Sequence, residues 1–181
     1  VIDNFLTGMR SYIDNGVELY DCDIRSGDAW EIAKKSDIVV HLAAQSGVMP
    51  SIHDPLQCID VNVYGTTNIL QGATEGNCRR FIFASSGGTV LGMQDPPVHE
   101  ETIPSPTSPY GASKVAGESL CESYYHSFGL ETIILRFGNV YGPWSMHKTG
   151  NLIPNFLLKM INEEFMPIYG DGTQTRDFIY I

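Results

Sequence analysis

The sequence predicts an α/β fold, a doubly wound parallel sheet with helices on its faces. Short apolar runs alternate along the chain with longer segments of helical character, which is the order that builds a parallel sheet. These apolar runs are continuous rather than interleaved with polar residues, as in strands that are buried on both faces. The chain has 181 residues, of which 43% are hydrophobic, so it can bury the core of one such domain.

Strands are expected at 17–20, 37–44, 80–86 and 131–137. Helices are expected near 26–35, 54–76, 108–128 and 151–162. The second helix opens with Asp54 and Pro55, a pair that favours a helix start. We expect the sheet domain to occupy residues 1–142 and the loop-rich segment 143–181 to begin a smaller substrate-binding region. Because both ends fall inside strand-like runs, we expect a fragment of a longer protein.

Charge and composition argue against several classes of partner. The chain carries 11 Lys and Arg against 21 Asp and Glu, which gives a net charge of -10. A chain this acidic is not expected to bind nucleic acid or an anionic membrane, although a helix N-terminus with one arginine can still hold a phosphate. No apolar run approaches the roughly 18 residues of a membrane span, and no signal-peptide pattern opens the chain.

The cysteines and histidines show no metal-ligand spacing, so no metal is expected. The four cysteines are widely separated and are expected as reduced thiols of a cytoplasmic protein: Cys22, Cys58, Cys78 and Cys121. His41 falls within an apolar run and is expected to be a satisfied core residue. No catalytic role is expected for it or for the remaining histidines, which are His53, His99, His126 and His147.

The segment "SPYGASKVAGESL" carries the strongest chemical signal. In a helix, Tyr110 and Lys114 lie on one face, about one turn apart. A cation about 4 Å from a phenol supplies roughly the 4 kcal/mol needed to bring a tyrosine pKa from about 10 to about 7, so Lys114 could make Tyr110 a base. Taken alone, the same spacing also describes a tyrosine and a lysine on a solvated helix face.

Two serines end the expected strand "RFIFASS" at the carboxyl edge of the sheet, where ligands bind in open α/β folds. A hydroxyl there could hydrogen-bond the substrate oxygen that the phenolate deprotonates. Counting along the strand favours Ser86 over Ser85 for this role. Serines before a pair of glycines are otherwise ordinary turn formers.

With these residues in order, the chain resembles the extended short-chain dehydrogenase/reductase family, within it the nucleotide-sugar epimerases of the UDP-glucose 4-epimerase kind. The resemblance covers essentially the whole chain. It rests on "SPYGASK", "LRFGNVYGP" and "GDGTQTRDFIY", with support from "NVYGTTNIL" and "FIFASSGGTV". It implies a Rossmann-like fold that lacks both its first strand and helix and the glycine-rich phosphate loop between them. We therefore expect the fragment alone to be inactive and to bind NAD weakly or not at all.

The resemblance implies NAD as the cofactor. Asp3 would bind the adenosine ribose hydroxyls and repel the extra phosphate of NADP, although by itself it could be a strand-end aspartate in a turn. Lys114 would hold the nicotinamide ribose and lower the pKa of Tyr110. Asn62 resembles a buried asparagine behind the nicotinamide, or is simply a polar helix residue. The full set of cofactor-binding residues implied is Asp3, Asn4, Asp23, Ile24, Leu42, Ala43, Ala44, Asn62, Ser85, Tyr110, Lys114 and Phe137.

The resemblance also implies a nucleotide-sugar substrate, with UDP as the nucleotide. Its binding residues would be Ser86, Asn139, Asn151, Leu152 and Arg176. Arg176 could grip a pair of diphosphate oxygens, although an arginine there could equally form a surface salt bridge. Homodimers are common in the family, through a bundle that would include the helices 54–76 and 108–128.

The reaction expected is epimerisation at C4 of the sugar through a transient 4-keto intermediate, with Tyr110, Lys114 and Ser86 as catalytic residues. Related 4,6-dehydratases carry an Asp-Glu pair after the strand hydroxyl, and UDP-glucuronate decarboxylases usually carry an acidic residue there. Here the position holds Gly87, Gly88 and Thr89, which disfavours both reactions. The alternatives left open are these two reactions and a non-catalytic sensor of NAD or a nucleotide sugar.

Overall fold

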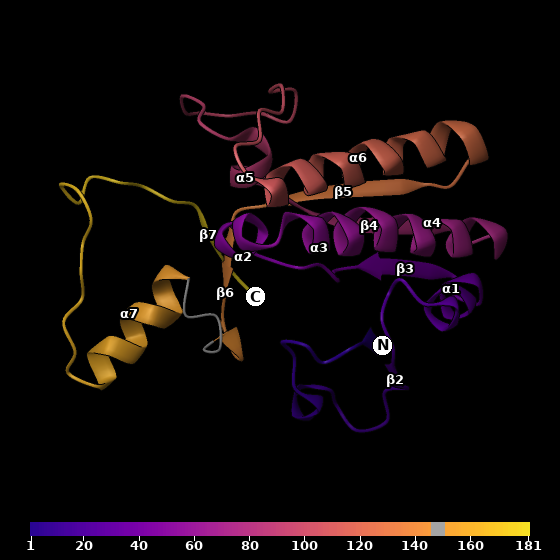
Figure 1. The fold of residues 1–181 in the computed structure, drawn as a ribbon, viewed down its shortest axis with the longest axis horizontal. Coiled ribbons are helices and arrows are strands. Elements are labelled where there is room, and N and C mark those ends of the chain that lie inside the picture. Colours follow the sequence, from indigo (N-terminus) through magenta and orange to yellow (C-terminus); the bar gives the residue numbers. More distant parts are fainter. Residues whose placement is uncertain (146–150) are drawn as a thin grey trace. The chain divides into compact units, whose positions relative to one another are not determined.

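The computed structural model describes residues 1–145 and 151–181. It separates into two compact units, Val1–Arg136 and Phe137–Ile181, which are described one at a time. The division lies between Arg136 and Phe137, a few residues before the boundary expected at 142 and 143. Figure 1 shows the elements of both units.

The first unit alternates strands with helices, as the sequence predicts. Its strands are β1 (Ile2–Asp3), β2 (Tyr20–Asp21), β3 (Ile38–His41), β4 (Arg80–Ser86) and β5 (Thr132–Phe137), whose last residue is counted with the second unit. Its helices are η1 (Arg10–Tyr12), α1 (Gly27–Lys34), α2 (Val48–His53), α3 (Pro55–Ile59), η2 (Asp60–Gly65), α4 (Thr66–Glu75), α5 (Gly87–Leu91) and α6 (Pro109–Phe128).

The strands pair in parallel, so the predicted α/β class is confirmed. β3 pairs with β4 from Ile38 opposite Arg80 to His41 opposite Phe83, and β5 lies on the other side of β4. β1 and β2 form a separate parallel pair with Asp3 opposite Asp21. Parallel pairing brings the carboxyl ends of neighbouring strands to one edge, where the candidate site residues lie.

The core of this unit lies between the sheet and the helices α4 and α6. Along β4 the buried residues alternate, and Phe81, Phe83 and Ser85 face the helices. Gly117 of α6 lies on the Phe83 ring, since a Cβ at that position would meet Phe83 Cζ at 2.4 Å. The missing side chain therefore lets α6 approach β4 closely, and the first turns of α6 come to the end of the strand.

The sequence signals for α6 are confirmed at both ends. Ser108 caps the helix by accepting the amide of Gly111, and Pro109 occupies the first helical position, where no amide is needed. Gly129 ends the helix with φ +73°, the left-handed conformation that favours glycine. These boundaries match the predicted helix 108–128 and place Tyr110 in its first turn.

The predicted helix 54–76 is interrupted. It begins as expected, with Asp54 accepting the amide of Gln57 ahead of Pro55. The middle is a π-helical segment, η2, between the α-helical segments α3 and α4. A π-turn holds an extra residue in one turn of helix, and such turns often occur at functional sites. It lies around Asn62, one of the predicted cofactor-binding residues.

Other boundaries and elements differ from the prediction. The strand expected at 17–20 is Tyr20–Asp21, and the strand expected at 37–44 ends at His41. Helices α2 and α5 had no clear signal, because α2 contains Pro50 and α5 begins with two glycines, which are poor helix formers. α5 follows Ser86 directly, so it shapes the chain next to the candidate site.

The second unit contains β6 (Asn139–Tyr141), α7 (Leu152–Ile161) and β7 (Phe178–Tyr180). β6 pairs in parallel with β7, from Asn139 opposite Phe178 to Tyr141 opposite Tyr180. The predicted helix 151–162 is confirmed as α7, and the strand-like run near the end of the sequence is β7.

Candidate active site

The carboxyl end of β4 and the first turns of α6 meet in the first unit. Lys114 Nζ donates a hydrogen bond of 2.8 Å to the carbonyl of Ala84, two residues before Ser86 on the same strand. The same ammonium lies 5.8 Å from the centroid of the Tyr110 ring. Tyr110 and Lys114 thus share one face of α6. This face lies at the end of β4, the strand that carries Ser86.

Lys114 is buried, with 3% of its surface exposed, and its ammonium lies over the Phe83 ring at 4.9 Å from the centroid. Burial lowers its pKa to about 8, because an ammonium loses hydration inside the protein. Tyr110 is half-buried. The alternative reading, a tyrosine and a lysine on a solvated helix face, is therefore wrong.

The expected effect of Lys114 on Tyr110 is not found. Burial raises the pKa of the Tyr110 phenol above its ordinary value, and the neighbouring Cys58 acts in the same direction. The ammonium of Lys114 is turned toward the carbonyl of Ala84. The decrease in the Tyr110 pKa that the spacing to Lys114 predicts is therefore not found, because burial of the phenol is the largest influence on this pKa.

The two serines at the end of β4 differ in what they contact. Ser85 is buried, and its hydroxyl donates to Glu118 Oε1 of α6 at 2.5 Å. Ser86 is half-buried, follows on the opposite face of the strand, and makes no side-chain capping bond to α5. The Ser85 hydroxyl is therefore engaged by Glu118. Cofactor binding by Ser85 and catalysis by Ser86 stay predictions.

Asn62 is buried within a network of side chains. Its Oδ1 accepts the amide of Gln45 at 2.7 Å, and its Nδ2 donates to the Gln45 carbonyl at 3.1 Å. The same Nδ2 donates to Ser113 Oγ at 2.9 Å, and Ser113 donates to the carbonyl of Tyr110 at 2.7 Å. Asn62 therefore ties the loop after β3 to Tyr110, and its amide is used within the protein.

The predicted adenosine-binding residues gather at the carboxyl end of β1 and β2. Asp3 accepts the amide of Phe5 at 2.7 Å, and Asn4 Nδ2 donates to Asp23 Oδ2 at 3.1 Å. Arg25 donates to both carboxylate oxygens of Asp23, and these hydrogen bonds lower the Asp23 pKa to about 2. The structure thus brings three predicted residues together, with Asp23 ionised at neutral pH.

Among the remaining cofactor candidates, Ile24 lies in the core of the unit. Its side chain is 8% exposed and belongs to the core, where it packs against Gly65. Its carbonyl accepts Asn68 Nδ2 at 2.8 Å. The place of Ile24 beside the adenine stays a prediction. Leu42 is exposed after the end of β3, and Ala43 and Ala44 are half-buried beside it.

The other predicted ligand-binding residues belong to the second unit. Phe137 ends β5, and Asn139 opens β6 with Nδ2 donating to the Asp177 carbonyl. Asn151 precedes α7 without capping it by its side chain, and Leu152 begins that helix. Arg176 is exposed and donates to the Thr175 carbonyl. His147 lies outside the described residues.

Three buried or half-buried polar groups near the site had no sequence signal. Gln45 Oε1 is buried and has no partner among the described residues. Ser51 is fully buried, and its Oγ accepts the Tyr110 amide at 3.1 Å. Glu118 is 7% exposed and pairs with Arg136. A serine 59 residues before Tyr110 in sequence could be connected to it only through the fold.

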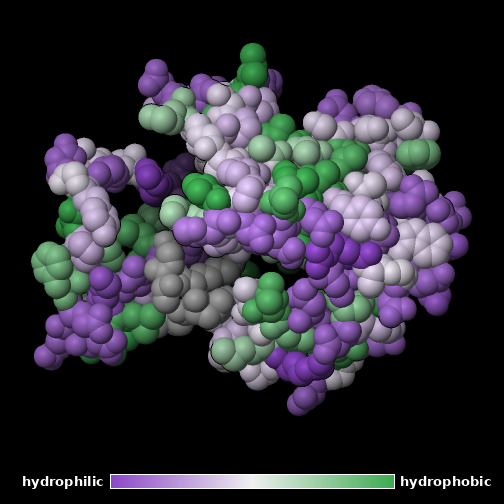
Figure 2. Space-filling model, in the orientation of Figure 1, coloured by the Kyte–Doolittle hydropathy of each residue, from purple (hydrophilic) through white to green (hydrophobic). Residues whose placement is uncertain are grey.

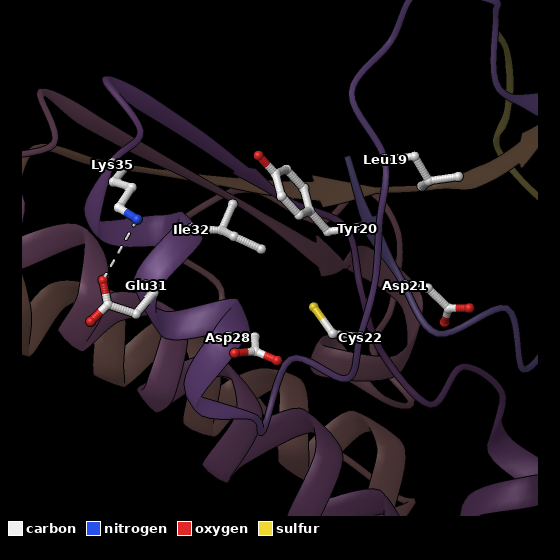
Figure 3. A pocket seen from close by; sticks show the side chains of 8 residues that line it. All are labelled: Leu19, Tyr20, Asp21, Cys22, Asp28, Glu31, Ile32 and Lys35. Atoms are coloured by element: carbon white, nitrogen blue, oxygen red, sulfur yellow. Dashed lines mark ion pairs between the residues drawn. The ribbon is translucent and has the colours of Figure 1, made fainter.

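A separate pocket of about 430 Å³ lies between β2 and α1 (Figure 3). Its lining includes the carboxylates Asp21, Asp28 and Glu31, and the Glu31 carboxylate pairs with Lys35. None of the predicted site residues lines it. Within residues 1–145 and 151–181, no cluster of three or more metal-binding side chains occurs, and no helix is long and apolar enough to cross a membrane.

Comparison with known proteins extends these observations. The sequence is 40% identical to a putative UDP-glucose 4-epimerase of Methanocaldococcus jannaschii, over 100% of this chain and 61% of that protein. It is also 35% identical to dTDP-D-glucose 4,6-dehydratase of Homo sapiens, over 81% of this chain and 41% of the other. The chain therefore spans about three fifths of the first relative and less of the second.

Two solved structures match the fold closely. The UDP-glucose 4-epimerase of Thermus thermophilus in complex with NAD gives a TM-score of 0.91 at 32% identity, over 99% of this chain and 61% of that one. The UDP-glucose 4-epimerase of Thermotoga maritima with UDP-glucose gives a TM-score of 0.92 at 31% identity, over 99% of this chain and 60% of that one. The family pattern matches all of residues 1–181. The chain belongs to the NAD dependent epimerase/dehydratase family.

Proposed function

We propose that the full-length protein epimerises a nucleotide sugar at C4 through a transient 4-keto intermediate. The observation that carries the proposal is the buried Lys114 ammonium, which lies on one helix face with Tyr110 and is bonded to the strand that ends at Ser86. A buried ammonium costs folding free energy, so its presence at a strand end beside a phenol is typical of a catalytic site.

NAD is the cofactor proposed, and the residues present fit it. The Lys114 ammonium has donors beyond its bond to Ala84 that suit ribose hydroxyls. Asp3 lies at the carboxyl end of β1, where a carboxylate suits the adenosine ribose and disfavours a 2′-phosphate. Gln45 offers a buried oxygen without a partner among the described residues. When bound, NAD would accept a hydride from C4 and return it, and its positive charge would favour the Tyr110 phenolate.

The protein's own residues would manage the proton of the 4-hydroxyl group. Tyr110 would remove this proton and later return it, and Ser86 would hydrogen-bond the oxygen in both forms. Because burial alone raises the pKa of Tyr110, the phenolate needs more than Lys114 to form. The base is therefore expected to become active only when the site is filled.

Epimerisation is favoured over dehydration and decarboxylation because the sequence places no carboxylate directly after Ser86. Gly87, Gly88 and Thr89 follow it. The buried carboxylate near this strand end, Glu118, accepts hydrogen bonds from Ser85 and Arg136. A carboxylate held in this way is a poor proton donor or acceptor, since either role would break the ion pair.

The substrate proposed is a UDP-sugar. In the second unit, Asn139, Asn151, Leu152 and Arg176 are the residues proposed to hold the nucleotide diphosphate, with the exposed Arg176 guanidinium suited to two phosphate oxygens. The two units are proposed to serve as cofactor-binding domain and substrate-binding region.

We further propose a cytoplasmic homodimer. The segment α3–η2 exposes Leu56 and Tyr64, and α6 exposes Tyr125 and Phe128, to between 52% and 82%. Figure 2 shows hydrophobic side chains at the surface in the region of α3 and α6. Exposed apolar groups on helices that pack against each other suit a helix-mediated interface. The free thiols of Cys22, Cys58, Cys78 and Cys121 suit a reducing compartment.

The test is turnover by the full-length protein with UDP-glucose and UDP-galactose, without added reductant. Conversion between the two that is lost in Tyr110→Phe supports the proposal. The matched control is Tyr124→Phe on the same helix, whose hydroxyl bonds Gln71 instead and whose loss should leave turnover intact. A 4-keto-6-deoxy product or released carbon dioxide would assign one of the other two reactions. NAD binding without any turnover would favour a sensor.

A further inference from the structure

We infer that Ser51 is a positioning residue for Tyr110. It fixes this tyrosine, the proposed base, to the segment after β3 that is proposed to line the cofactor. The inference rests on the proposed function. Ser51 lies in α2, is fully buried, and accepts the backbone amide of Tyr110 on its Oγ at 3.1 Å. Its hydroxyl proton goes to the Val48 carbonyl at 2.7 Å, so the orientation of the hydroxyl is fixed.

The hydrogen bond from the Tyr110 amide to Ser51 is made in the first turn of α6. The amide groups in the first turn of a helix have no partner within the helix. In α6, Pro109 has no amide, and Ser108 accepts the amide of Gly111 from within the same segment. The amide of Tyr110 is instead taken by Ser51, 59 residues earlier in the sequence. The bond therefore fixes Tyr110 relative to another part of the fold as well as completing the cap.

A second connection holds the other side of the same residue. The Tyr110 carbonyl accepts Ser113 Oγ, which accepts Asn62 Nδ2, and Asn62 is bonded to both the amide and the carbonyl of Gln45. Gln45 and Ser51 belong to one short segment that continues from β3 through the residues proposed to line the cofactor.

That segment thus reaches both the amide and the carbonyl of Tyr110. The loop against which the cofactor would rest and the residue that would act as the base are held together. A displacement of the reacting groups by about 1 Å can reduce a rate about 100-fold, so these bonds would act on turnover as well as on stability.

The experiment compares Ser51→Ala with Ser108→Ala in the full-length protein. Each substitution removes a serine oxygen that accepts one amide in the first turn of α6, so each should lower the Tm to a similar extent. Only Ser51→Ala releases the amide of Tyr110 itself. We expect kcat at saturating UDP-sugar to fall about 10- to 100-fold in Ser51→Ala with little change in KM, and to stay within about 3-fold in Ser108→Ala.

Hydrogen exchange of the Tyr110 amide is measured on the same proteins, because it does not depend on turnover. Faster exchange in Ser51→Ala than in Ser108→Ala, with the selective loss of kcat, supports the inference. Equal losses of kcat in the two variants overturn it while leaving the proposed function in place. If the wild-type protein has no epimerase activity, the proposed function fails, and the catalytic part of the inference fails with it. Exchange at Tyr110 then tests only the structural part: unchanged exchange in Ser51→Ala overturns it, and selectively faster exchange supports it.

Discussion

Glu118 and Arg136 form a bidentate ion pair near the end of β4. Arg136 Nε donates to Glu118 Oε1 at 2.9 Å, and its Nη2 donates to Oε2 at 2.7 Å. Ser85 donates to the same carboxylate, and Arg136 also donates to the Glu100 carbonyl. The pair therefore connects α6 and the ends of β4 and β5 to the loop before α6, close to the proposed catalytic residues.

Loss of the Glu118 charge should destabilise the protein strongly. Glu118→Gln leaves the Arg136 guanidinium partly buried without its counter-ion, and breaking a buried pair in this way costs about 3–5 kcal/mol. Since Arg136 keeps some exposure, we expect the free energy of unfolding in urea to fall by about 3 kcal/mol. Glu122→Gln, on the exposed face of the same helix, should change it by less than about 0.5 kcal/mol. Equal effects of the two substitutions would contradict a structural role for the pair.

Replacement of Gly117 should show how closely α6 approaches the sheet. In Gly117→Ala the new methyl group would meet Phe83 Cζ at 2.4 Å, so the ring or the helix must move. We expect a loss of about 1–3 kcal/mol in the free energy of unfolding, despite the better helix propensity of alanine. Gly88→Ala is the control, because a Cβ at that position has nothing within 4 Å, and it should be neutral or slightly stabilising. Chemical denaturation of both variants decides the matter.

His41 should make stability depend on pH. It is 4% exposed, and burial followed by the charge of Lys114 lowers its pKa to about 3, against an ordinary value of 6.5. Between these two values the unfolded chain binds a proton that the folded protein does not. The contribution of His41 to the free energy of unfolding is therefore complete above pH 6.5. As the pH falls below this value, the contribution is lost by about 1.4 kcal/mol per pH unit.

The measurement for His41 is the free energy of unfolding between pH 7 and pH 5. Relative to the wild type, His41→Gln should remove about 2 kcal/mol of the decrease over this range. His126→Gln, at an exposed position of α6, is the matched histidine control. A wild-type slope that persists in His41→Gln would show that His41 is not the group responsible.

Lys114→Met should separate activity from stability. Lowering the Lys114 pKa from 10.5 to about 8 corresponds to about 3 kcal/mol of unfavourable folding free energy at neutral pH, which methionine would relieve. The substitution also leaves the Ala84 carbonyl without its donor, at a cost of about 1–3 kcal/mol. We expect the free energy of unfolding to change by less than about 2 kcal/mol while turnover is abolished. A larger loss of stability would indicate that the ammonium is mainly structural.

Local signals in the sequence determined much of the fold. Ser108, Pro109 and Gly129 set the limits of α6, because caps and breakers act on the few residues beside them. The continuous apolar run of β4 determined that strand, and the spacing of four residues determined that Tyr110 and Lys114 share a face. The assignment to the family likewise follows from motifs in the sequence.

The tertiary structure decided the hydrogen-bond partners and the burial of the site residues, because both depend on segments distant in the chain. Only folding brings Ser85 to Glu118, which leaves Ser86 as the strand-end serine proposed for catalysis, and only folding brings Ser51 to the Tyr110 amide. The pKa of Tyr110 also follows from burial, which the residue spacing does not contain, and burial raises it where the spacing alone predicted a decrease. Hydrogen-bond partners and desolvation are properties of packed surroundings, and those surroundings are set by segments that meet only in the folded chain.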